Sequence, residues 1–518
     1  MIWHPEVQTL DAVPAFHAAR RPQAPALVAQ GRVTTYLELD QASSATARAL
    51  RAVGVAPGDR VAYLGRESES YYELLFGCAK AGAVLVPVNW RLTAVEVEHI
   101  LRDSGTILLF VEDTFGPVAK AAAAELPEPP ETVALEGFQR WRGEGGSGEA
   151  EQRHIFPDDE VAQLYTSGTT GLPKGVVLAH RSFFAVRDAL GGAGLDWIDW
   201  QDGDVSLIAV PGFHIGGLWW AVQGLAAGVE NVVLPAFAPA AALDAVRTRG
   251  VTTTCLVPSM IRMLLAEAGV TRADFATLRK IAYGGSPIST DLLAQCAERI
   301  GCQLTQLYGL TETGNTAVCL PPAEHVPGSE RLLAAGRPYP GFGAKVVAPD
   351  GRELPAGESG EICLRTPGHM IGYWGLPQAT ADTLRDGWIH TGDAGYLDAD
   401  GFVYVRDRIK DTVIIAGENV FPAEVEAALT AHPAVADAAV VGRPDERWGE
   451  ALHAFVVLGD GGPVTPRELM LFLRGRLADF KIPAGFEFVA ELPRNPSGKI
   501  LRRELRKRFW ADGERQVN

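Results

Sequence analysis

The segment YTSGTTGLPKGV, residues 165 to 176, combines small hydroxyl side chains with three glycines and a single lysine. Backbone N–H groups exposed by glycine, together with hydroxyl donors, are suited to hold a phosphate. The spacing excludes a P-loop, because Pro173 precedes Lys174 and Gly175 follows it, where that motif needs a glycine and then a hydroxyl. The flanks VAQLY and VVLAH predict a strand, a loop and a second strand. Taken alone, the loop is equally compatible with an ordinary turn.

Five further stretches stand out when they are read with this loop. They are GGSPIS (284–289), YGLTET (308–313), TGD (391–393), VRDRIKDTVIIAGENVFPAEVE (405–426) and PRNPSGKILRREL (493–505). Together the six stretches resemble the adenylate-forming enzymes, a family that includes acyl-CoA synthetases, aryl-CoA ligases, firefly-type luciferases and peptide-synthetase adenylation domains. The resemblance covers nearly the whole chain, with the motifs in the family's order, and the sequence as a whole is most similar to bacterial fatty-acyl-CoA synthetases.

The resemblance implies an ATP-dependent ligase that works in two steps. A carboxylate first attacks the α-phosphate of ATP to give an acyl adenylate and pyrophosphate, and the thiol of coenzyme A then displaces AMP to give a thioester. Attack of one anion on another requires cations that neutralise the charge developing at phosphorus, and close positioning of both reactants. The implied cofactors are ATP and Mg²⁺, with coenzyme A as co-substrate.

The resemblance also implies roles for individual residues around the nucleotide. The opening loop would close over the β and γ phosphates with Lys174 in support, Tyr308 would face the adenine, and Thr311 would contact the α-phosphate. Glu312 would hold Mg²⁺, a hard cation that prefers carboxylate oxygens. The implied ATP-binding residues are Thr166, Ser167, Gly168, Thr169, Thr170, Gly171, Lys174, Gly284, Gly285, Ser286, Pro287, Tyr308, Gly309, Thr311, Asp393, Arg408 and Lys499.

The later motifs are given their roles by the same resemblance. Asp393 would accept both ribose hydroxyls, since a carboxylate carries acceptors alone, and Lys410 would be the hinge of a C-terminal domain. Lys499 would reach the α-phosphate and the attacking carboxylate, because its compact charge on a flexible stem can be delivered and removed. The implied coenzyme A contacts are Gly417, Glu418 and Asn419. The neighbours of Lys499 that we expect to form a solvated basic face are Arg502, Arg503, Arg506 and Lys507.

The stretch PGFHIGGLWW, residues 211 to 220, matches the family segment beside the acyl pocket. We expect His214 to be a gate or positioning residue and not a general base, because a carboxylate with a pKa near about 4 needs no base at neutral pH. Trp219 and Trp220 are expected to line or cap the pocket. The implied acyl-pocket residues are His214, Gly216, Gly217, Tyr283, Gly284 and Gly309. The pocket is predicted to be apolar, for a fatty, alicyclic or aryl acid.

Some elements can be predicted from residue patterns alone. Ala42, Ala45, Ala49 and Val53 recur at helical spacing before Gly54, and RVAYLG, AVLVPV and ILLFV are typical of strands. Thr93 with Glu96 forms a capping box, as does Thr465 with Glu468 at the start of a helix reaching about residue 477. Ser286 and Pro287 are predicted to open another helix.

Helices that alternate with strands predict an α/β fold with mostly parallel pairing. The resemblance adds a large N-terminal layered α/β domain of two parallel-rich sheets with helices and a distorted β-barrel, followed by a small mobile α+β C-terminal domain. We place the N-terminal domain at 1–407, the hinge at 408–410 and the C-terminal domain at 411–518. The low-complexity run RGEGGSGEAE (142–151) is expected to be a surface loop.

Composition limits the partners. A net charge of −16 opposes general binding to nucleic acid or anionic membrane. We expect no transmembrane helix, because no apolar run is long enough, and no secretory signal. The six cysteines have no metal-ligand spacing and indicate a reducing cytoplasm. The partners expected are a carboxylic acid, ATP and coenzyme A. A homodimer and a separate carrier protein or acyltransferase stay open.

Three alternatives to a CoA ligase remain at this point. An adenylating enzyme could pass its acyl group to a carrier protein's phosphopantetheine or to a partner enzyme. A non-enzymatic nucleotide-binding relic predicts lost catalytic residues, yet Thr311, Glu312, Asp393, Arg408 and Lys499 are all present. A luciferase-type oxidation is the most remote of the three.

Overall fold

A computed structural model describes residues 1–144, 153–166, 172–286, 288–415, 418–445, 448–459, 461–474, 476–494 and 500–510, with the side chains of Lys410, Glu418 and Asn419 left out. The chain forms two compact units. The first contains Met1–Ala344 and Leu364–His390, and the second contains Lys345–Cys363 and Thr391–Asn518. The predicted boundary near residue 407 falls within the second unit, and the predicted hinge at 408–410 stays a prediction.

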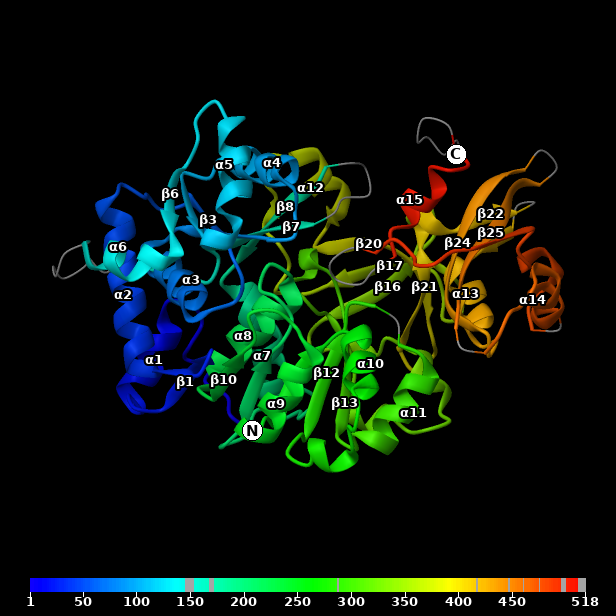
Figure 1. The fold of residues 1–518 in the computed structure, drawn as a ribbon, viewed down its shortest axis with the longest axis horizontal. Coiled ribbons are helices and arrows are strands. Elements are labelled where there is room, and N and C mark those ends of the chain that lie inside the picture. The colour runs from blue at the N-terminus through cyan, green and yellow to red at the C-terminus, as the bar shows by residue number, and fades with distance from the viewer. Residues whose placement is uncertain are drawn as a thin grey trace. The chain divides into compact units, whose positions relative to one another are not determined.

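The first unit is built on two sheets whose central strands are parallel (Figure 1). The nine-stranded sheet has the order β15 (Arg337–Pro338), β14 (Val318–Leu320), β13 (Gln303–Tyr308), β12 (Lys280–Gly284), β11 (Thr253–Leu256), β9 (Val205–Ile208), β10 (Glu230–Val233), β1 (Pro25–Ala29), β2 (Arg32–Thr35). Strands β13, β12, β11, β9, β10 and β1 pair in parallel, whereas β2, β14 and β15 add antiparallel edges.

The second sheet of this unit has seven strands. Its order is β18 (Gly372–Tyr373), β8 (Lys174–Ala179), β7 (Glu160–Thr166), β4 (Val84–Val88), β3 (Arg60–Leu64), β5 (Leu108–Val111), β6 (Glu131–Ala134). Strands β7, β4, β3, β5 and β6 pair in parallel, and β8 and β18 pair antiparallel at one edge. The two strands predicted on either side of the loop in YTSGTTGLPKGV are therefore confirmed as β7 and β8, whereas residues 167–171 of the loop lie outside the described residues.

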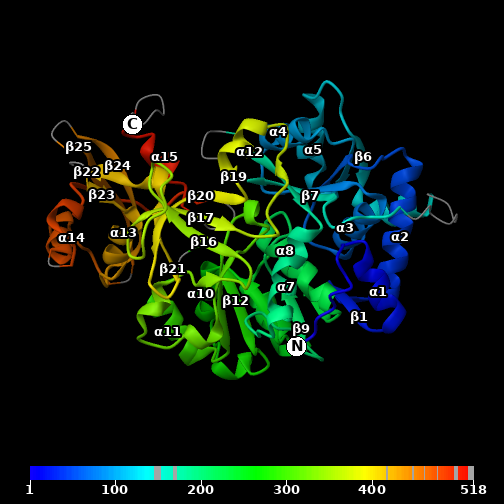
Figure 2. The ribbon, with the colours of Figure 1, turned by 180° about the vertical axis from the view of Figure 1, so that it is seen from behind.

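Helices cover both faces of these sheets, as the period-2 alternation of the strands requires. Val61 and Tyr63 of β3 face the main core, whereas Ala62 and Leu64 face a second cluster on the opposite side. The helices that contribute to the main core are α1 (Ala12–Arg20), α2 (Tyr36–Ala52), α3 (Glu69–Ala81), α6 (Phe138–Glu144), α7 (Arg181–Ala193) and α8 (Ile215–Ala227). Helices α7 and α8 lie side by side in both ribbon views (Figure 2).

The remaining helices of the first unit pack on the outer faces. The outer cluster of the seven-stranded sheet includes α4 (Ala94–Ser104) and α5 (Gly116–Ala124). That of the nine-stranded sheet includes α9 (Pro239–Arg249), α10 (Pro258–Ala266) and α11 (Thr290–Arg299). Helix α12 (Pro377–Thr383) follows β18. The predicted layered α/β architecture is thus confirmed.

The predicted helix starts can be compared residue by residue. The capping boxes at Thr93 and Thr465 both form, and α4 ends where Gly105 adopts a left-handed φ of 63°. The prediction that Ser286 and Pro287 open a helix is wrong, because Ser289 is the N-cap of α11 and accepts the Leu292 N–H. Pro287 itself lies outside the described residues.

A third sheet and a fourth complete the fold. The third contains β16 (Gly343–Val347), β17 (Gly360–Arg365), β20 (Trp388–Leu397), β19 (Leu384–Arg385) and β21 (Val403–Arg408), and the chain passes between the two units within β16, β17 and β20. The fourth contains β23 (Glu418–Val420), β22 (Val413–Ile415), β25 (Gly449–Leu458), β24 (Val435–Asp445) and β26 (Gly485–Phe488).

The fourth sheet forms the α+β core of the second unit. Alternate residues of β24 face two clusters, with Val440 on the side of α13 (Pro422–Thr430) and α14 (Pro466–Leu473), and Val441 on the side of α15 (Arg502–Arg506). Helix α14 ends at Leu473, short of the predicted residue 477, because Arg474 has an extended backbone.

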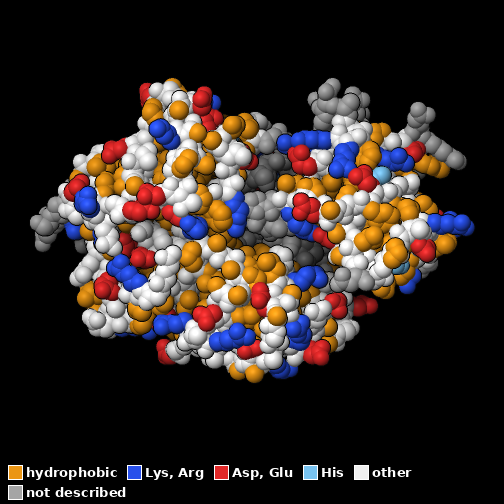
Figure 3. Space-filling model, viewed as in Figure 1, with side chains coloured by type: hydrophobic (Ala, Val, Ile, Leu, Met, Phe, Trp, Pro, Cys, Tyr) orange, Lys and Arg blue, Asp and Glu red, His pale blue; other side chains and the backbone are white. Residues whose placement is uncertain are grey.

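Surface charges, helix lengths and cysteines can be compared with the partners expected from composition. Lys and Arg side chains are interspersed with Asp and Glu on the face of the first unit in Figure 3. Across the described residues, no helix is both long and apolar enough to cross a bilayer. All six cysteines are free thiols.

Candidate active site

Three of the predicted motifs follow strands of the nine-stranded sheet. PGFH follows β9, GGS follows β12, and YGLTE follows β13. Strand β11 pairs in parallel with both β9 and β12, and β12 pairs in parallel with β13, so the carboxyl ends of these strands share one edge. Ligands of open α/β sheets bind at this edge. The topology therefore brings the predicted acyl and nucleotide segments together.

Glycine allows the segments at this edge to pack closely. A Cβ atom at Gly309 would lie 2.4 Å from the carbonyl oxygen of Asn315, and one at Gly284 would lie 2.4 Å from that of Leu307. Both contacts are too short for a side chain, so these two glycines are required for packing as well as for any ligand approach.

The two glycines at the start of α8 differ. A Cβ atom at Gly216 would meet only the Asn315 amide oxygen, at 3.8 Å, whereas one at Gly217 would lie 2.2 Å from the carbonyl oxygen of Val210. Of these two implied acyl-pocket residues, Gly216 therefore borders open space, whereas Gly217 serves the close approach of α8 to its preceding loop. Trp219 and Trp220, predicted to line or cap the pocket, are instead buried in the main core.

Thr311 and Glu312 lie in a single 3₁₀ turn, Thr311–Thr313. The Thr313 hydroxyl accepts the Leu310 N–H at 2.8 Å, and Gly314 and Asn315 close the turn with φ values of 73° and 98°. A left-handed φ is uncommon for a non-glycine residue and points to a functional constraint. The Asn315 amide nitrogen is buried and has no hydrogen-bond partner among the described residues. Asn315 was not among the predicted site residues.

The base of the phosphate loop is held by α4. Thr166 pairs with Lys174 across the hairpin, His99 Nε2 lies 3.0 Å from the Pro173 carbonyl oxygen, and the Tyr165 hydroxyl donates to Asp103 at 2.6 Å. Of the predicted loop residues, Thr166 and Lys174 are placed by the structure. Ser167, Gly168, Thr169, Thr170 and Gly171 lie outside the described residues.

Strand β18 connects this hairpin to the Glu312 turn. Tyr373 pairs with Val176 directly after the loop, and its hydroxyl donates to Glu312 Oε1 at 2.6 Å. The Met370 N–H donates to the Glu312 carbonyl oxygen at 2.9 Å, and Lys174 Nζ lies 5.0 Å from the centre of the Tyr373 ring. Tyr373 of this short strand thus contacts both predicted phosphate-site residues, Lys174 and Glu312.

His214 caps the start of α8 with its backbone. Burial, with a smaller contribution from the positive charge of Arg91, lowers the pKa of its imidazole to about 4. Its Nε2 atom is buried and has no hydrogen-bond partner in the part of the chain that the structure describes. The ring is therefore neutral at pH 7, and a base of such low pKa is poorly suited to remove a proton. This supports a positioning role over that of a general base.

A buried carboxyl group anchors the segment before His214. Glu67 Oε1 accepts the Gly212 N–H at 2.6 Å, Glu67 Oε2 accepts the Tyr72 hydroxyl at 2.7 Å, and the Tyr71 hydroxyl donates to the Gly212 carbonyl oxygen at 3.1 Å. Burial raises the pKa of Glu67 to about 7, although both hydrogen bonds act to lower it. The Gly212 peptide is thus bonded at both ends, which fixes the approach to α8.

The remaining predicted site residues of the first unit lie in the GGS segment and at Tyr283 and Tyr308. Gly285 has a left-handed φ of 79°, and Ser286 is exposed after β12. Tyr308 is half-buried at the end of β13. Tyr283 is fully buried in the outer cluster, with its hydroxyl donating to Gln306 at 3.1 Å and 2.9 Å from His325 Nε2.

The second unit holds the other predicted nucleotide residues. Asp393 and Arg408 face each other across β20 and β21 and form an ion pair at 2.7 Å. Lys410 lies in the 3₁₀ turn Ile409–Asp411, and Glu418 and Asn419 lie in β23. Gly417 and Lys499 lie outside the described residues.

The segment around Lys410 is bound to α15 by buried ion pairs. Arg502 pairs with Glu426 at 2.6 Å, with Asp407 at 3.5 Å and with Asp411 at 3.4 Å, and Arg506 also pairs with Asp411. The solvated basic face predicted here is therefore wrong for Arg502 and Arg506. It holds for Arg503 and Lys507, whose side chains are 64% and 53% exposed.

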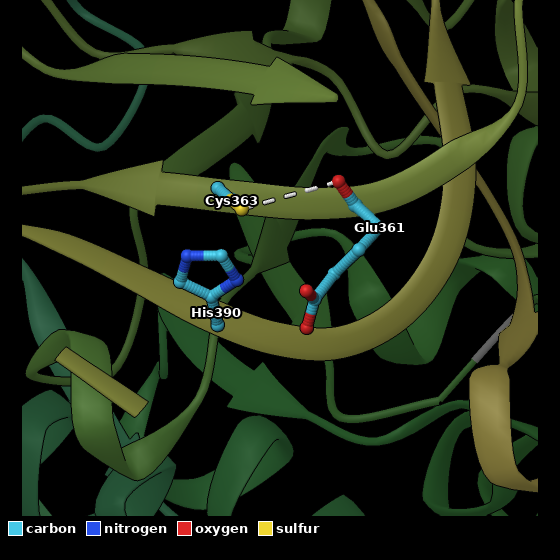
Figure 4. A group of neighbouring side chains, drawn as sticks. All are labelled: Glu361, Cys363 and His390. Atoms are coloured by element: carbon cyan, nitrogen blue, oxygen red, sulfur yellow. Dashed lines mark hydrogen bonds between the residues drawn. The ribbon is translucent and has the colours of Figure 1, made fainter. Parts of the chain in front are cut away.

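Glu361, Cys363 and His390 form a separate group on β17 and β20 (Figure 4). One ligand atom from each lies within 4.8 Å of the others, although the spacing of these residues along the chain gave no indication of it. The Cys363 thiol donates to the Glu361 carbonyl oxygen, and the Glu361 carboxylate accepts the Gly392 N–H at 3.1 Å. We assign no metal to this group.

Comparison with known families decides the identity of this arrangement. The profile of the AMP-binding enzymes matches residues 15–374, and that of the AMP-binding enzyme C-terminal domain matches residues 424–499. The chain is an AMP-binding enzyme. It therefore belongs to the adenylate-forming superfamily that the six motifs indicated.

Individual relatives of this AMP-binding enzyme span its full length. It is 60% identical over 517 residues to the fatty acid–[acyl-carrier-protein] ligase ScoC of Streptomyces coeruleorubidus, covering 99% of both chains, and 39% identical to a feruloyl-CoA synthase of an Amycolatopsis species, covering 97% of this chain and 99% of the relative. The o-succinylbenzoate CoA synthetase MenE of Bacillus subtilis, solved with ATP and a magnesium ion, has a TM-score of 0.85 at 33% identity, covering 95% and 98% of the two chains.

The donors present in this AMP-binding enzyme fit a magnesium ion and a nucleotide. Glu312 offers a carboxylate to a hard cation, and Lys174 offers a cation to phosphate. Within the described ranges, neither side chain forms an ion pair, and both contact the same neutral tyrosine. Their charges are therefore available to a ligand.

Proposed function

We propose that this AMP-binding enzyme activates an apolar fatty acid with ATP and transfers the acyl group to the phosphopantetheine thiol of a carrier protein. The observation that carries the adenylation step is the pairing of Lys174 and Glu312 with one neutral phenol at the edge of the phosphate loop. The carrier-protein acceptor is supported by the 60% identity to a fatty acid–[acyl-carrier-protein] ligase over 99% of both chains.

In the first step, a carboxylate oxygen of the acid forms a bond to the α-phosphorus of ATP, and pyrophosphate leaves with the electrons of the broken bond. Lys174, the Thr166 hydroxyl and the loop residues Ser167, Gly168, Thr169, Thr170 and Gly171 would hold the β and γ phosphates. Glu312 would hold Mg²⁺, which when bound neutralises phosphate charge. Thr311 and Lys499 would stabilise charge at the α-phosphate.

Other residues would orient the nucleotide and the acid. Gly284, Gly285, Ser286 and Pro287 would border the adenine with Tyr308 and Gly309, and Asp393 would accept the ribose hydroxyls once its pairing with Arg408 rearranges. His214, neutral at pH 7, would position the carboxylate, while Gly216 would leave room for the acyl chain. The roles of Gly217 and Tyr283 in the acyl pocket stay predictions.

In the second step, the thiol sulfur attacks the acyl carbonyl carbon, AMP leaves, and the thiol proton passes to solvent or phosphate. Lys410 is proposed as the hinge between the steps, with 1–407 and 411–518 as the domains it joins. Gly417, Glu418 and Asn419 are proposed to border the pantetheine arm. The six free thiols support the proposal of a reducing cytoplasmic location.

Free coenzyme A is the second candidate acceptor. It is favoured by the feruloyl-CoA synthase relative and by the GENVFP segment that the resemblance assigns to pantetheine. Pantetheine is common to coenzyme A and to carrier proteins, so the segment by itself does not separate the two acceptors.

The proposal is tested by AMP formation with a panel of straight-chain, alicyclic and aryl acids, each assayed with phosphopantetheinylated carrier protein, with free coenzyme A and with no acceptor. We expect straight-chain acids to give acid-dependent pyrophosphate exchange and an acylated carrier protein. Lys499→Ala is expected to lower acid-dependent pyrophosphate release by at least about 100-fold. Pyrophosphate exchange together with a thioester on free coenzyme A, and none on the carrier protein, would select the second candidate. Absence of pyrophosphate exchange with every acid would exclude adenylation.

A further inference from the structure

Tyr373 lies outside the motifs that bind the nucleotide, yet it contacts two of their charged residues. Its hydroxyl donates to Glu312 Oε1 at 2.6 Å, and its ring faces Lys174 Nζ at 5.0 Å from the ring centre. A hydrogen bond of this length from a hydroxyl to a carboxylate lies within the charge-assisted range. A lysine at this distance from a tyrosine face is within the range of a cation–π interaction.

The backbone fixes Tyr373 in this place from both sides. Its strand pairs antiparallel with β8, and the Tyr373 N–H donates to Thr380 Oγ1 at 2.9 Å. The neighbouring Trp374 N–H donates to the Gly175 carbonyl oxygen at 2.8 Å, next to Lys174. The Arg60 guanidinium lies 3.4 Å above the Trp374 ring. The phenol is therefore presented by a strand that cannot shift without breaking the base of the phosphate hairpin.

Glu312 is held on its backbone by the same segment. The Met370 N–H donates to the Glu312 carbonyl oxygen at 2.9 Å, so residues 370–373 bind Glu312 at both its peptide and its side chain. The hydrogen bond from the phenol to Oε1 restrains the carboxylate and leaves Oε2 for another interaction. Groups that orient a metal-binding carboxylate in this way commonly change metal affinity by about 10- to 100-fold when removed.

We propose that Tyr373 is a positioning residue that orients Glu312 toward a divalent cation and Lys174 toward the nucleotide phosphates. This inference rests on the proposed function, because it presumes an ATP site at these two residues. Its chemistry separates into two parts. The hydroxyl acts on Glu312, and the ring face acts on Lys174.

Two substitutions separate these parts. Tyr373→Phe removes the hydroxyl and keeps the ring, whereas Tyr373→Leu removes both. A matched control is Tyr72→Phe, which loses a tyrosine–carboxylate hydrogen bond of 2.7 Å in the same unit, to Glu67 instead of Glu312. Any effect common to all three variants is then a general cost of losing a buried contact.

The readout is equilibrium binding of ATP to the full chain, without acid or acceptor, in excess Mg²⁺ and in EDTA. Tyr373→Phe is expected to lose about tenfold of the affinity in Mg²⁺ and none in EDTA. Tyr373→Leu is expected to lose a further factor of about three in ATP affinity in both conditions, because the aromatic ring that faces Lys174 is removed. Tyr72→Phe should keep the wild-type ratio between the two conditions.

A second readout uses the metal directly. Mn²⁺ binding in the presence of ATP, followed by electron paramagnetic resonance, is expected to weaken about tenfold in Tyr373→Phe. A wild-type ratio of Mg²⁺ to EDTA affinity in Tyr373→Phe would overturn this inference alone, with ATP binding by the wild type still supporting the proposed function. A wild type that binds no ATP in either condition would overturn both.

Discussion

The two units treat their charged site residues in opposite ways. In the first unit, Lys174 and Glu312 form no ion pair among the described residues and share a neutral tyrosine. In the second unit, Asp393 pairs with Arg408, and Arg502 pairs with three carboxylates. Lys174 and Glu312 of the first unit are thus contacted by a neutral group, whereas Asp393 and Arg502 of the second unit have partners of opposite sign.

This difference indicates different tasks for the two sets. A charge that meets a ligand must not be neutralised by the protein beforehand, and hydrogen bonds from neutral donors orient it without removing its charge. A buried charge that maintains structure needs an opposite charge, because burial without one is costly. We therefore expect removal of a charge in the first unit to affect binding, and removal of Arg502 to affect folding.

The largest effect is expected for Arg502→Met. The change leaves Asp407, Asp411 and Glu426 close together and without their shared cation, which should cost about 3–5 kcal/mol. Hydrogen exchange of amides in α13 and β24 measures this loss within the second unit. Arg503→Met, at a side chain that is 64% exposed, is the matched control. Equal amide protection in Arg502→Met and Arg503→Met would contradict a structural role for the ion pairs of Arg502.

An intermediate effect, and one that depends on pH, is expected for Glu67→Gln. Burial raises the pKa of Glu67 from 4.5 to about 7, so between these values the folded protein keeps a proton that the unfolded chain has lost. Wild-type stability must therefore fall as pH rises through this window and stay reduced above it. The glutamine of the variant does not titrate. As pH rises through this window, the free energy of unfolding of the variant relative to wild type should therefore rise by up to about 3 kcal/mol.

Urea unfolding at pH 4.5 and at pH 8 measures this relative change. Glu125→Gln, on the surface after α5, is the control and should show no change with pH. If Glu67→Gln followed the control, Glu67 would be ionised at neutral pH and the first unit would contain a buried charge held by neutral donors alone.

The smallest effect in free energy is expected for Lys174→Met, which removes the same charge as Arg502→Met. Its affinity for ATP should fall about tenfold, or roughly 1.4 kcal/mol, since one phosphate contact is lost. Its unfolding free energy should stay within about 0.5 kcal/mol of wild type, because no ion pair is broken among the described residues. ATP binding and thermal unfolding of the same preparation measure both quantities. A loss of stability comparable to that of Arg502→Met would remove the distinction between the units.

Much of the fold could be predicted because local signals agree with it. The capping boxes at Thr93 and Thr465 and the two strands that flank the loop in YTSGTTGLPKGV depend on residues close in sequence, and all of them form. The start of α11 was missed because two serines, Ser286 and Ser289, precede it, and only the backbone conformation selects which one caps the helix.

The site was predicted less completely, for a different reason. The sequence motifs marked Lys174, Thr311 and Glu312, since residues of these types beside glycine match a known family. Nothing in the sequence marked Glu67 or Tyr373, which act on residues 145 and 61 positions away. Hydrogen bonds of this kind depend on which strands and helices pack together, and no local pattern reports them.

The sequence by itself determined the family, the alternation of helices and strands, and the chemical types at the nucleotide site. Only the tertiary structure decided which charges are paired and which are free to meet a ligand. Arg502 and Arg503 are adjacent and chemically identical, yet one is bound among buried carboxylates and the other is exposed to solvent. That outcome follows from the side of α15 on which each lies. The sequence encodes the charge of a residue, but the packing around that residue determines whether it lies beside opposite charges or in solvent.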